Sequence, residues 1–308
     1  MRITDAHHPS QATVTSDPSH WLSLSGGELS ARIDPLGAQL SELRDGSGRD
    51  LLWGGDPAVW AGRAPLLFPI VGALAGGEYR VDGKPYRLPR HGFARVSTFQ
   101  VLDASASGAA LRLKADEATL QLYPFSFELD IRFVLDGATL SMTTLVRNLG
   151  EQKMPASFGY HPAFRWPLPF GQARSDHFIE FAAEESSPVR RLDAAGLLLP
   201  ERYPTPVEHR RLALTDALFE HDVLIFDDLR SRAVTYGAHQ GPRLRVSFPD
   251  SPYLGFWSKP QAGFVCIEPW HGVADPQGFS GNFSAKQGVF MVLPGATMAA
   301  KMAITLLP

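Results

Sequence analysis

The sequence predicts an all-β protein, because three features of the 308-residue chain favour strands and turns over helices. Short runs alternate apolar and polar residues with a period of two, as in FELDIRFVL (127–135). Asp-Gly pairs join two such runs in two places, which is a strong short-range signal of a β-hairpin. The 28 glycines and 25 prolines are scattered without a period. Many short strands with frequent turns predict a sandwich or a barrel.

One expected hairpin joins residues 78–81 to 84–88 through Asp82-Gly83, and the other joins 127–135 to 138–146 through Asp136-Gly137. Further strands are expected in four alternating runs: 27–33, 38–43, 110–115 and 118–123. Helical periodicity is scarce. Its best candidate, residues 215–229, has a plausible cap at Thr215 but soon becomes an apolar VLIF run typical of a strand.

Composition and charge exclude several classes of protein. With 44% hydrophobic and 20% charged residues, the chain can bury a large core. A net charge of −3 gives no general attraction to nucleic acid or anionic lipid. The single cysteine, Cys266, rules out an intrachain disulfide and suits a reducing compartment, so we expect a cytoplasmic protein.

The first twenty residues lack the apolar stretch of a signal peptide, so residues 1–20 are expected to form a polar tail and 21–308 a single domain. The longest hydrophobic stretch, 64–76, is broken by Pro69 and Gly72. It is shorter than the ~20 apolar residues of a membrane helix, so no membrane association is expected.

Four segments place a His, Arg or Glu beside glycine, proline or aromatic residues at the end of a strand-like run: 60–69, 89–95, 158–167 and 263–272. A β-scaffold presents functional residues on such loops. Aromatic rings beside polar groups suit a sugar, which has apolar C–H faces and hydroxyl edges. Arg63, in the first segment, needs an anionic or hydroxylated partner beside its apolar neighbours.

The last segment ends an apolar run on a carboxylate, Glu268. Phe264, Cys266 and Glu268 share one face of a strand by alternation. Pro269 donates no N–H, so we expect it to end the ladder and leave Glu268 at the rim of a pocket. Trp270 is expected nearby as a stacking wall.

Other chemistries are weakly signalled. Four residues are of types that can bind a metal: His91, His161, His271 and Glu268. However, no His-x-His pair occurs. Pro269 interrupts Glu268-x-x-His271, so we do not expect this stretch to form the helix on which the Glu-x-x-His metal motif depends. The chain has neither a Gly-x-Ser-x-Gly elbow nor a nucleotide-binding glycine fingerprint after a strand. We therefore expect no metal and no cofactor, with a metal enzyme kept as an alternative that elemental analysis would decide.

In these segments the chain resembles the aldose 1-epimerase (galactose mutarotase-like) family, and within it a bacterial branch of mutarotase-related proteins. The matching stretches occur in the family's order: GRAPLLFPIVG (62–72), RHGFAR (90–95), FGYHPAF (158–164), HDVLIF (221–226) and CIEPWHG (266–272). The resemblance runs from about residue 21 to the C-terminus. It implies a β-supersandwich of antiparallel sheets with a sugar site on its concave face.

The resemblance also implies interconversion of the α and β anomers of a free aldose. Position by position, His161 matches the general acid, Glu268 the general base and His91 the second histidine, while Arg63 and Asp222 match residues that hold sugar hydroxyls. Ring opening needs a base at the C1 hydroxyl and an acid at the ring oxygen. We expect burial to raise the pKa of the carboxyl, and the carboxylate to keep the imidazole protonated.

Two positions depart from the family pattern: Tyr160 precedes the acid where mutarotases carry Asn, and Val96 follows HGFAR. Two rival functions stay open. A hexose-6-phosphate 1-epimerase would need a phosphate-binding arginine cluster, which Arg87, Arg90 and Arg95 could supply unless they form a solvated face. A non-catalytic sugar-binding protein could use the same fold. The expected partner is a monosaccharide, and the expected assembly is a monomer or a homodimer.

Overall fold

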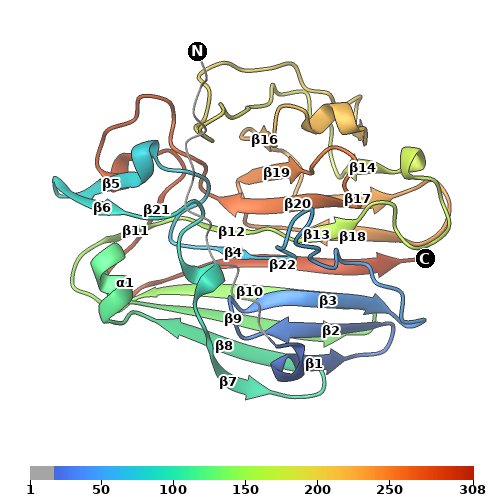
Figure 1. The fold of residues 1–308 in the computed structure, drawn as a ribbon, viewed down its shortest axis with the longest axis horizontal. Helices are drawn as coiled ribbons and strands as arrows, with labels where there is room; N and C mark the ends of the chain where they lie inside the picture. Colours follow the sequence, from blue (N-terminus) through green and yellow to red (C-terminus); the bar gives the residue numbers. More distant parts are fainter. Residues whose placement is uncertain (1–16) are drawn as a thin grey trace, which may run out of the picture.

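Two large antiparallel sheets share one hydrophobic core, which confirms the all-β prediction. The structure is a computed structural model that describes residues 17–308, so most of the expected polar tail lies outside the described residues. Figure 1 shows the strands of both sheets running in roughly the same direction across the molecule. Apolar side chains from both sheets belong to a single buried cluster, as expected for sheets packed face to face.

The larger sheet has nine strands, and its centre is the hairpin predicted at Asp136-Gly137. Gly137 has a φ of 55°, and Thr139 pairs with Asp136 across the turn. Buried residues alternate along the second strand of the hairpin, as the sequence pattern predicts. In spatial order the strands are β15 (Arg211–Ala213), β14 (Phe178–Phe181), β17 (Ala233–Gly237), β18 (Arg243–Ser247), β22 (Thr297–Leu307), β10 (Thr139–Asn148), β9 (Phe127–Asp136), β8 (Gly108–Lys114) and β7 (Gln100–Ala104).

The six-stranded sheet carries the residues of interest. Its strands are β16 (Leu224–Phe226), β19 (Tyr253–Trp257), β20 (Phe264–His271), β12 (Phe158–Tyr160) and β4 (Leu66–Leu67), with β13 (Ala163–Arg165) also paired to β20. One face of this sheet packs into the shared core through Val265 and Ile267. Tyr160 crosses that core, and its hydroxyl lies 2.9 Å from Oγ1 of Thr144 on β10. The opposite face is left for the site.

Three smaller sheets flank these two. They are β1 (Leu22–Ser25) with β2 (Leu29–Asp34) and β3 (Gln39–Asp45), β5 (Glu78–Val81) with β6 (Lys84–Arg87), and β11 (Met154–Ala156) with β21 (Phe290–Val292). The β5–β6 hairpin confirms the second prediction, because Asp82 and Gly83 both have positive φ, 49° and 79°, as a type I′ turn requires.

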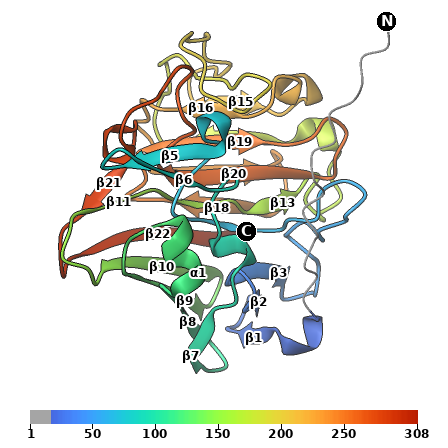
Figure 2. The same cartoon turned by 60° about the vertical axis from the view of Figure 1, so that its left-hand side comes forward.

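The run 118–123, predicted as a strand, is instead the α-helix α1 (Glu117–Leu122). The cause is a capping box: the Asp116 carboxylate accepts the N–H of Thr119 at 2.8 Å, and the Thr119 hydroxyl accepts the N–H of Asp116 at 2.8 Å. The helix lies near the β5–β6 hairpin (Figure 2). The hydroxyl of Tyr79 donates to the carbonyl of Leu122 there.

Short 3₁₀ turns complete the described chain: η1 (Pro18–His20), η2 (Ala75–Gly77), η3 (Ala94–Val96), η4 (Arg174–Asp176), η5 (Asp216–Phe219) and η6 (Phe283–Ala285). The candidate helix 215–229 thus resolves into η5 followed by the strand β16. Among the described residues, no helix has the length and apolar character needed to span a bilayer.

Candidate active site

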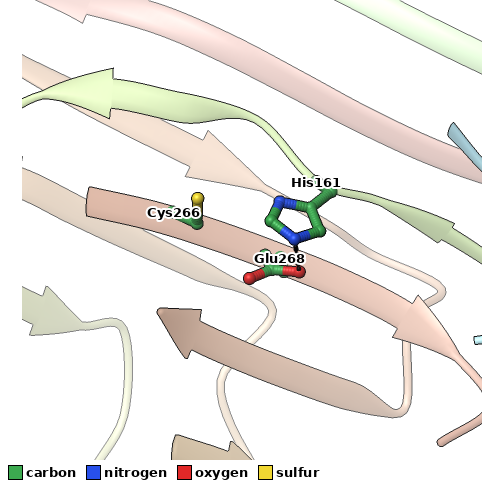
Figure 3. A group of neighbouring side chains, drawn as sticks. All are labelled: His161, Cys266 and Glu268. Atoms are coloured by element: carbon green, nitrogen blue, oxygen red, sulfur yellow. Dashed lines mark ion pairs between the residues drawn. The ribbon is translucent and has the colours of Figure 1, made fainter. Parts of the chain in front are cut away.

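His161 and Glu268 face each other because of the strand register. Strand β20 pairs with β12 at Gly159–Trp270 and with β13 at Ala163–Cys266. The register is the same on both sides of the gap between β12 and β13, so His161 in that gap lies directly opposite Glu268. Side chains directly opposite across an antiparallel pair are close neighbours. The Nε2 atom of His161 lies 3.1 Å from Oε2 of Glu268 (Figure 3).

Strand β20 does not end at Pro269, as the sequence predicted, but continues to His271. The N–H of Ile267 donates to the carbonyl of Pro162, which lies in the gap. Because alternate residues of a strand direct their N–H groups to the same side, the nitrogen of Pro269 faces the gap as well. A proline is tolerated there. Glu268 is consequently held inside a continuous strand, 1% exposed, and not at a rim.

A cavity of about 400 Å³ opens over this pair. Its size is in the range of pockets for small ligands. Five of the six site residues expected from the sequence line it: His91, His161, Asp222, Glu268 and Trp270.

Aromatic rings form much of the cavity wall. The ring of Trp60 stacks on His161 with centroids 5.2 Å apart, and Trp257 meets the same imidazole edge-on at 5.8 Å. Trp270 lies flat over the neighbouring strands because these carry glycine there. A Cβ at Gly159 or Gly255 would stand 2.6 or 2.7 Å from the indole. The cavity therefore offers flat apolar surfaces beside a titratable pair.

Burial controls the charge of that pair. It raises the pKa of Glu268, and the nearby negative charge of Asp222 raises it further. Burial also lowers the pKa of His161, to about 3. The expectation that the carboxylate keeps the imidazole protonated is therefore wrong, because desolvation outweighs that attraction. In the free cavity the two groups form a neutral pair that holds one proton between them.

His91 adds a hydrogen-bond donor to the cavity. Its Nδ1 accepts the N–H of Gly72 at 3.1 Å, so the proton of the neutral ring is on Nε2. Burial lowers its pKa, and the charges of Arg95 and Arg90 act in the same direction. The ring meets His161 edge-on at 5.8 Å. His91 is thus suited to donate a hydrogen bond rather than to release a proton.

Comparison with known proteins agrees with this geometry. A family model described as Aldose 1-epimerase matches residues 21–282. The chain belongs to the aldose 1-epimerase family. The chromosomal LacX protein of Lactococcus lactis is 34% identical over 289 residues, which cover 91% of this chain and 97% of LacX.

Two solved structures have the fold of this aldose 1-epimerase family member. A galactose mutarotase related enzyme from Lactobacillus acidophilus matches with a TM-score of 0.86 at 30% identity, over 94% of this chain and 97% of that one. A galactose mutarotase-like protein from Lactobacillus casei matches with a TM-score of 0.87 at 27% identity, over 93% and 100%. The expected galactose mutarotase-like supersandwich is therefore confirmed.

Arg63, the sixth expected site residue of this family member, does not line the cavity. Its Nη1 donates to the carbonyl of Ser41 at 2.9 Å, and its guanidinium lies over the ring of Trp21, 4.9 Å from the centroid. These partners belong to the region of the three-stranded sheet. The sequence-based assignment of Arg63 to sugar hydroxyls is corrected accordingly: the side chain has a structural role.

Three cations that were not assigned to the site do line the cavity: Arg90, Arg95 and Lys259. The ammonium of Lys259 donates to the carbonyl of Val59. Arg90 and Arg95 are the first and last residues of the RHGFAR segment, so the sequence did indicate that they lie close to His91. Val96, which departs from the family pattern, is instead 56% exposed.

One grouping among residues 17–308 has the composition of a metal site: His161, Cys266 and Glu268 offer ligand atoms within 4.8 Å of one another (Figure 3). Burial raises the pKa of the Cys266 thiol, so without a metal the thiol keeps its proton. Cys266 packs with Ala163 and Phe264 in an apolar cluster. A metal would have to displace the proton of this thiol, so elemental analysis of the purified protein decides between a metal centre and the acid–base pair alone.

Proposed function

We propose that the protein is an aldose 1-epimerase that interconverts the α and β anomers of an aldose by acid–base ring opening. The observation that carries the proposal is the contact of 3.1 Å between His161 and Glu268 at the floor of the cavity. In a cyclic aldose, O1 and O5 are bonded to the same carbon. Two protonatable groups in contact with each other can therefore serve both oxygens.

In the proposed reaction Glu268 faces O1 and His161 faces O5. As sugar enters, the single proton passes from Glu268 to His161. Glu268 then takes the O1 proton while His161 protonates O5, so the C1–O5 bond breaks and the C1=O bond forms. After rotation about C1–C2, both protons return as the ring closes on the other face.

The burial of the pair supports this direction of proton flow. Ring opening converts a charged Glu268–His161 pair into a neutral one, and burial favours the neutral form of each group. The site is thus better matched to the open-chain intermediate than to the cyclic complex. Interactions that strengthen along the reaction path are those that accelerate it.

Polarimetry of freshly dissolved glucose and galactose tests the proposal. Glu268→Gln and His161→Asn should each lower the enzymatic rate by about 10²–10⁴-fold, the usual contribution of one acid–base group. Glu128→Gln is the control, because Glu128 lies in β9 of the other sheet. A variant of either cavity residue with a near wild-type rate would refute the roles. Sugar binding by the wild type without turnover would favour the non-catalytic sugar-binding protein.

A specific observation favours a second candidate, in which the aldose carries an anionic group, as a hexose 6-phosphate does. No other residue of 17–308 pairs with or hydrogen-bonds to the guanidinium of Arg90 or Arg95. Burial lowers the pKa of the partly buried Arg95, and the charge of Arg90 lowers it further. Two cations held together without a counter-ion suit an anionic ligand. Arg87, the third member of the sequence cluster, is outside the lining and its side chain is 77% exposed.

Comparing kcat/KM on glucose and on glucose 6-phosphate separates the two substrates. If the anionic group binds here, Arg90→Gln and Arg95→Gln should lower kcat/KM on the phosphate and change it little on glucose. Arg87→Gln is the control, because Arg87 belongs to the same segment but lies outside the cavity lining. The substrate would instead be a free aldose if the wild type has a higher kcat/KM on glucose than on glucose 6-phosphate and if neither cavity substitution changes these values.

A further inference from the structure

A buried ion pair lies behind the His91 wall of the cavity. The ammonium of Lys286 is 3.2 Å from Oδ1 of Asp275, and the two side chains are 0% and 3% exposed. Lys286 follows η6, and Asp275 lies four residues beyond the end of β20. Removing two opposite charges from water costs much of what their attraction returns, so such a pair is weak evidence of stabilisation. Its contacts indicate what it holds instead.

Asp275 fixes the short segment 73–75. Its Oδ2 accepts the N–H of Ala75 at 2.9 Å, and its own N–H donates to the carbonyl of Ala73 at 2.9 Å. The ion pair with Lys286 holds the other carboxylate oxygen, Oδ1. Both oxygens are therefore engaged, and the carboxylate has one orientation relative to the segment.

Gly72 directly precedes segment 73–75 and makes two hydrogen bonds with His91. The N–H of Gly72 donates to Nδ1 of His91 at 3.1 Å, and the carbonyl of Gly72 accepts the N–H of His91 at 2.9 Å. Gly72 also lies against Ala274, the residue before Asp275, since a Cβ on Gly72 would stand 2.6 Å from that of Ala274. His91 itself has a φ of 68°, a conformation that its surroundings must impose.

We propose that Lys286 and Asp275 are positioning residues that hold His91 with Nδ1 as an acceptor and Nε2–H directed to the cavity. The chain of contacts runs from Lys286 to Asp275, through segment 73–75 to Gly72, and on to the imidazole. The charge of Lys286 acts on His91 in the same sense as burial, against protonation. The effect on turnover rests on the proposed function; the effect on the imidazole does not.

The direct test uses ¹⁵N NMR of the His91 ring, because protonated and unprotonated imidazole nitrogens have distinct shifts. In the wild type we expect protonated Nε2 and unprotonated Nδ1 throughout pH 5–8. A His91 that is protonated on Nδ1, or that titrates in this range, would overturn the proposal without any variant.

A double variant removes Oδ2 of Asp275, the acceptor for the N–H of Ala75, and leaves no unpaired buried charge. In Asp275→Ala/Lys286→Met we expect a mixture of His91 tautomers and a kcat lowered about ten- to a hundredfold, as for a small misplacement of a binding group. Asp275→Asn/Lys286→Met keeps an oxygen for the N–H of Ala75 but removes the ion pair at the other oxygen, so it should restore the wild-type ¹⁵N pattern only in part. An unchanged His91 in the first variant, or a full wild-type pattern in the second, would contradict the chain of contacts.

An ion pair in the nine-stranded sheet, far from His91 in the fold, serves as the control. Asp130 is equally buried, and Arg112 Nε lies 2.5 Å from its Oδ1. Arg112→Met/Asp130→Ala should lower stability without altering the His91 pattern or kcat, and an equal change in His91 would show that the effect is not specific. If the wild type turns over no aldose, the proposed function fails while the NMR comparison still decides the role of Lys286 and Asp275.

Discussion

Replacing Glu268 with Gln should stabilise the folded protein at neutral pH while removing its activity. In the unfolded chain the carboxyl has its ordinary pKa of 4.5, whereas in the fold burial raises that pKa well above this value. A group with a raised pKa in the fold binds more protons there than in the unfolded chain. The stability that it contributes is full below pH 4.5 and is lost as pH rises toward the folded pKa. Gln does not ionise in either state, so the variant escapes this loss.

The magnitude follows from the pH interval. Each pH unit above 4.5 costs the wild type about 1.4 kcal/mol for as long as Glu268 keeps its proton in the fold. The advantage of Glu268→Gln should therefore grow with pH by up to about 1.4 kcal/mol per unit over the range in which the folded carboxyl stays protonated. His161 has a lowered pKa, so the stability that it contributes is present above pH 6.5 and is lost on acidification. Because both proteins contain His161, its contribution cancels in the difference.

Urea unfolding at pH 5, 6 and 7 measures this difference. Glu128→Gln is the control with the opposite sign, because the ion pairs of Glu128 lower its pKa despite partial desolvation. That variant should be less stable than the wild type by a similar amount at pH 5, 6 and 7, because the stability linked to a lowered pKa is lost only as pH falls below the ordinary value of 4.5. If Glu268→Gln is less stable than the wild type by the same amount at all three pH values, the pair is a resting ion pair and the reasoning from burial is wrong.

Three further outcomes are expected. Arg63→Met should lower the free energy of unfolding by about 1–3 kcal/mol, because it removes the hydrogen bond to Ser41 and the contact with Trp21. It should leave kcat/KM unchanged, and a fall in kcat/KM at unchanged stability would show that Arg63 belongs to the site. Gly255→Ala should displace Trp270, lower the free energy of unfolding in urea by about 1–3 kcal/mol and raise KM. Gly263→Ala, whose added Cβ has its nearest contact at 3.4 Å, is the control. Equal effects of the two substitutions would show that the position of Trp270 against Gly255 does not matter for binding. A pH profile of kcat/KM should show no inflection near 6.5, since burial lowers the pKa of His161 to about 3, and an inflection there would indicate an accessible imidazole.

Local signals in the sequence were sufficient for the hairpins. Asp82-Gly83 and Asp136-Gly137 each join alternating runs, and turn chemistry and side-chain alternation act over a few residues. The helix α1 was missed because its apolar residues also alternate. Its start depends on a side-chain cap at Asp116 that lies outside the run taken as a strand.

The site was only partly predictable, because its geometry depends on long-range pairing. The resemblance to the family selected His161 and Glu268, but their direct opposition comes from the register of β20 against β12 and β13, about a hundred residues earlier in the chain. Arg63 was misassigned for the same reason: the partners that turn its guanidinium away, Trp21 and Ser41, lie in another sheet region.

Depth of burial was the other quantity that the sequence could not supply. Proximity alone favours a charged Glu268–His161 pair, whereas enclosure under Trp60 and Trp257 favours a neutral one, and enclosure has the larger effect. This balance links stability to chemistry. The desolvation that costs the fold stability at neutral pH is the same desolvation that favours the neutral pair accompanying an open-chain sugar. Substitutions that relieve it, such as Glu268→Gln, should therefore gain stability only by giving up the proton transfer.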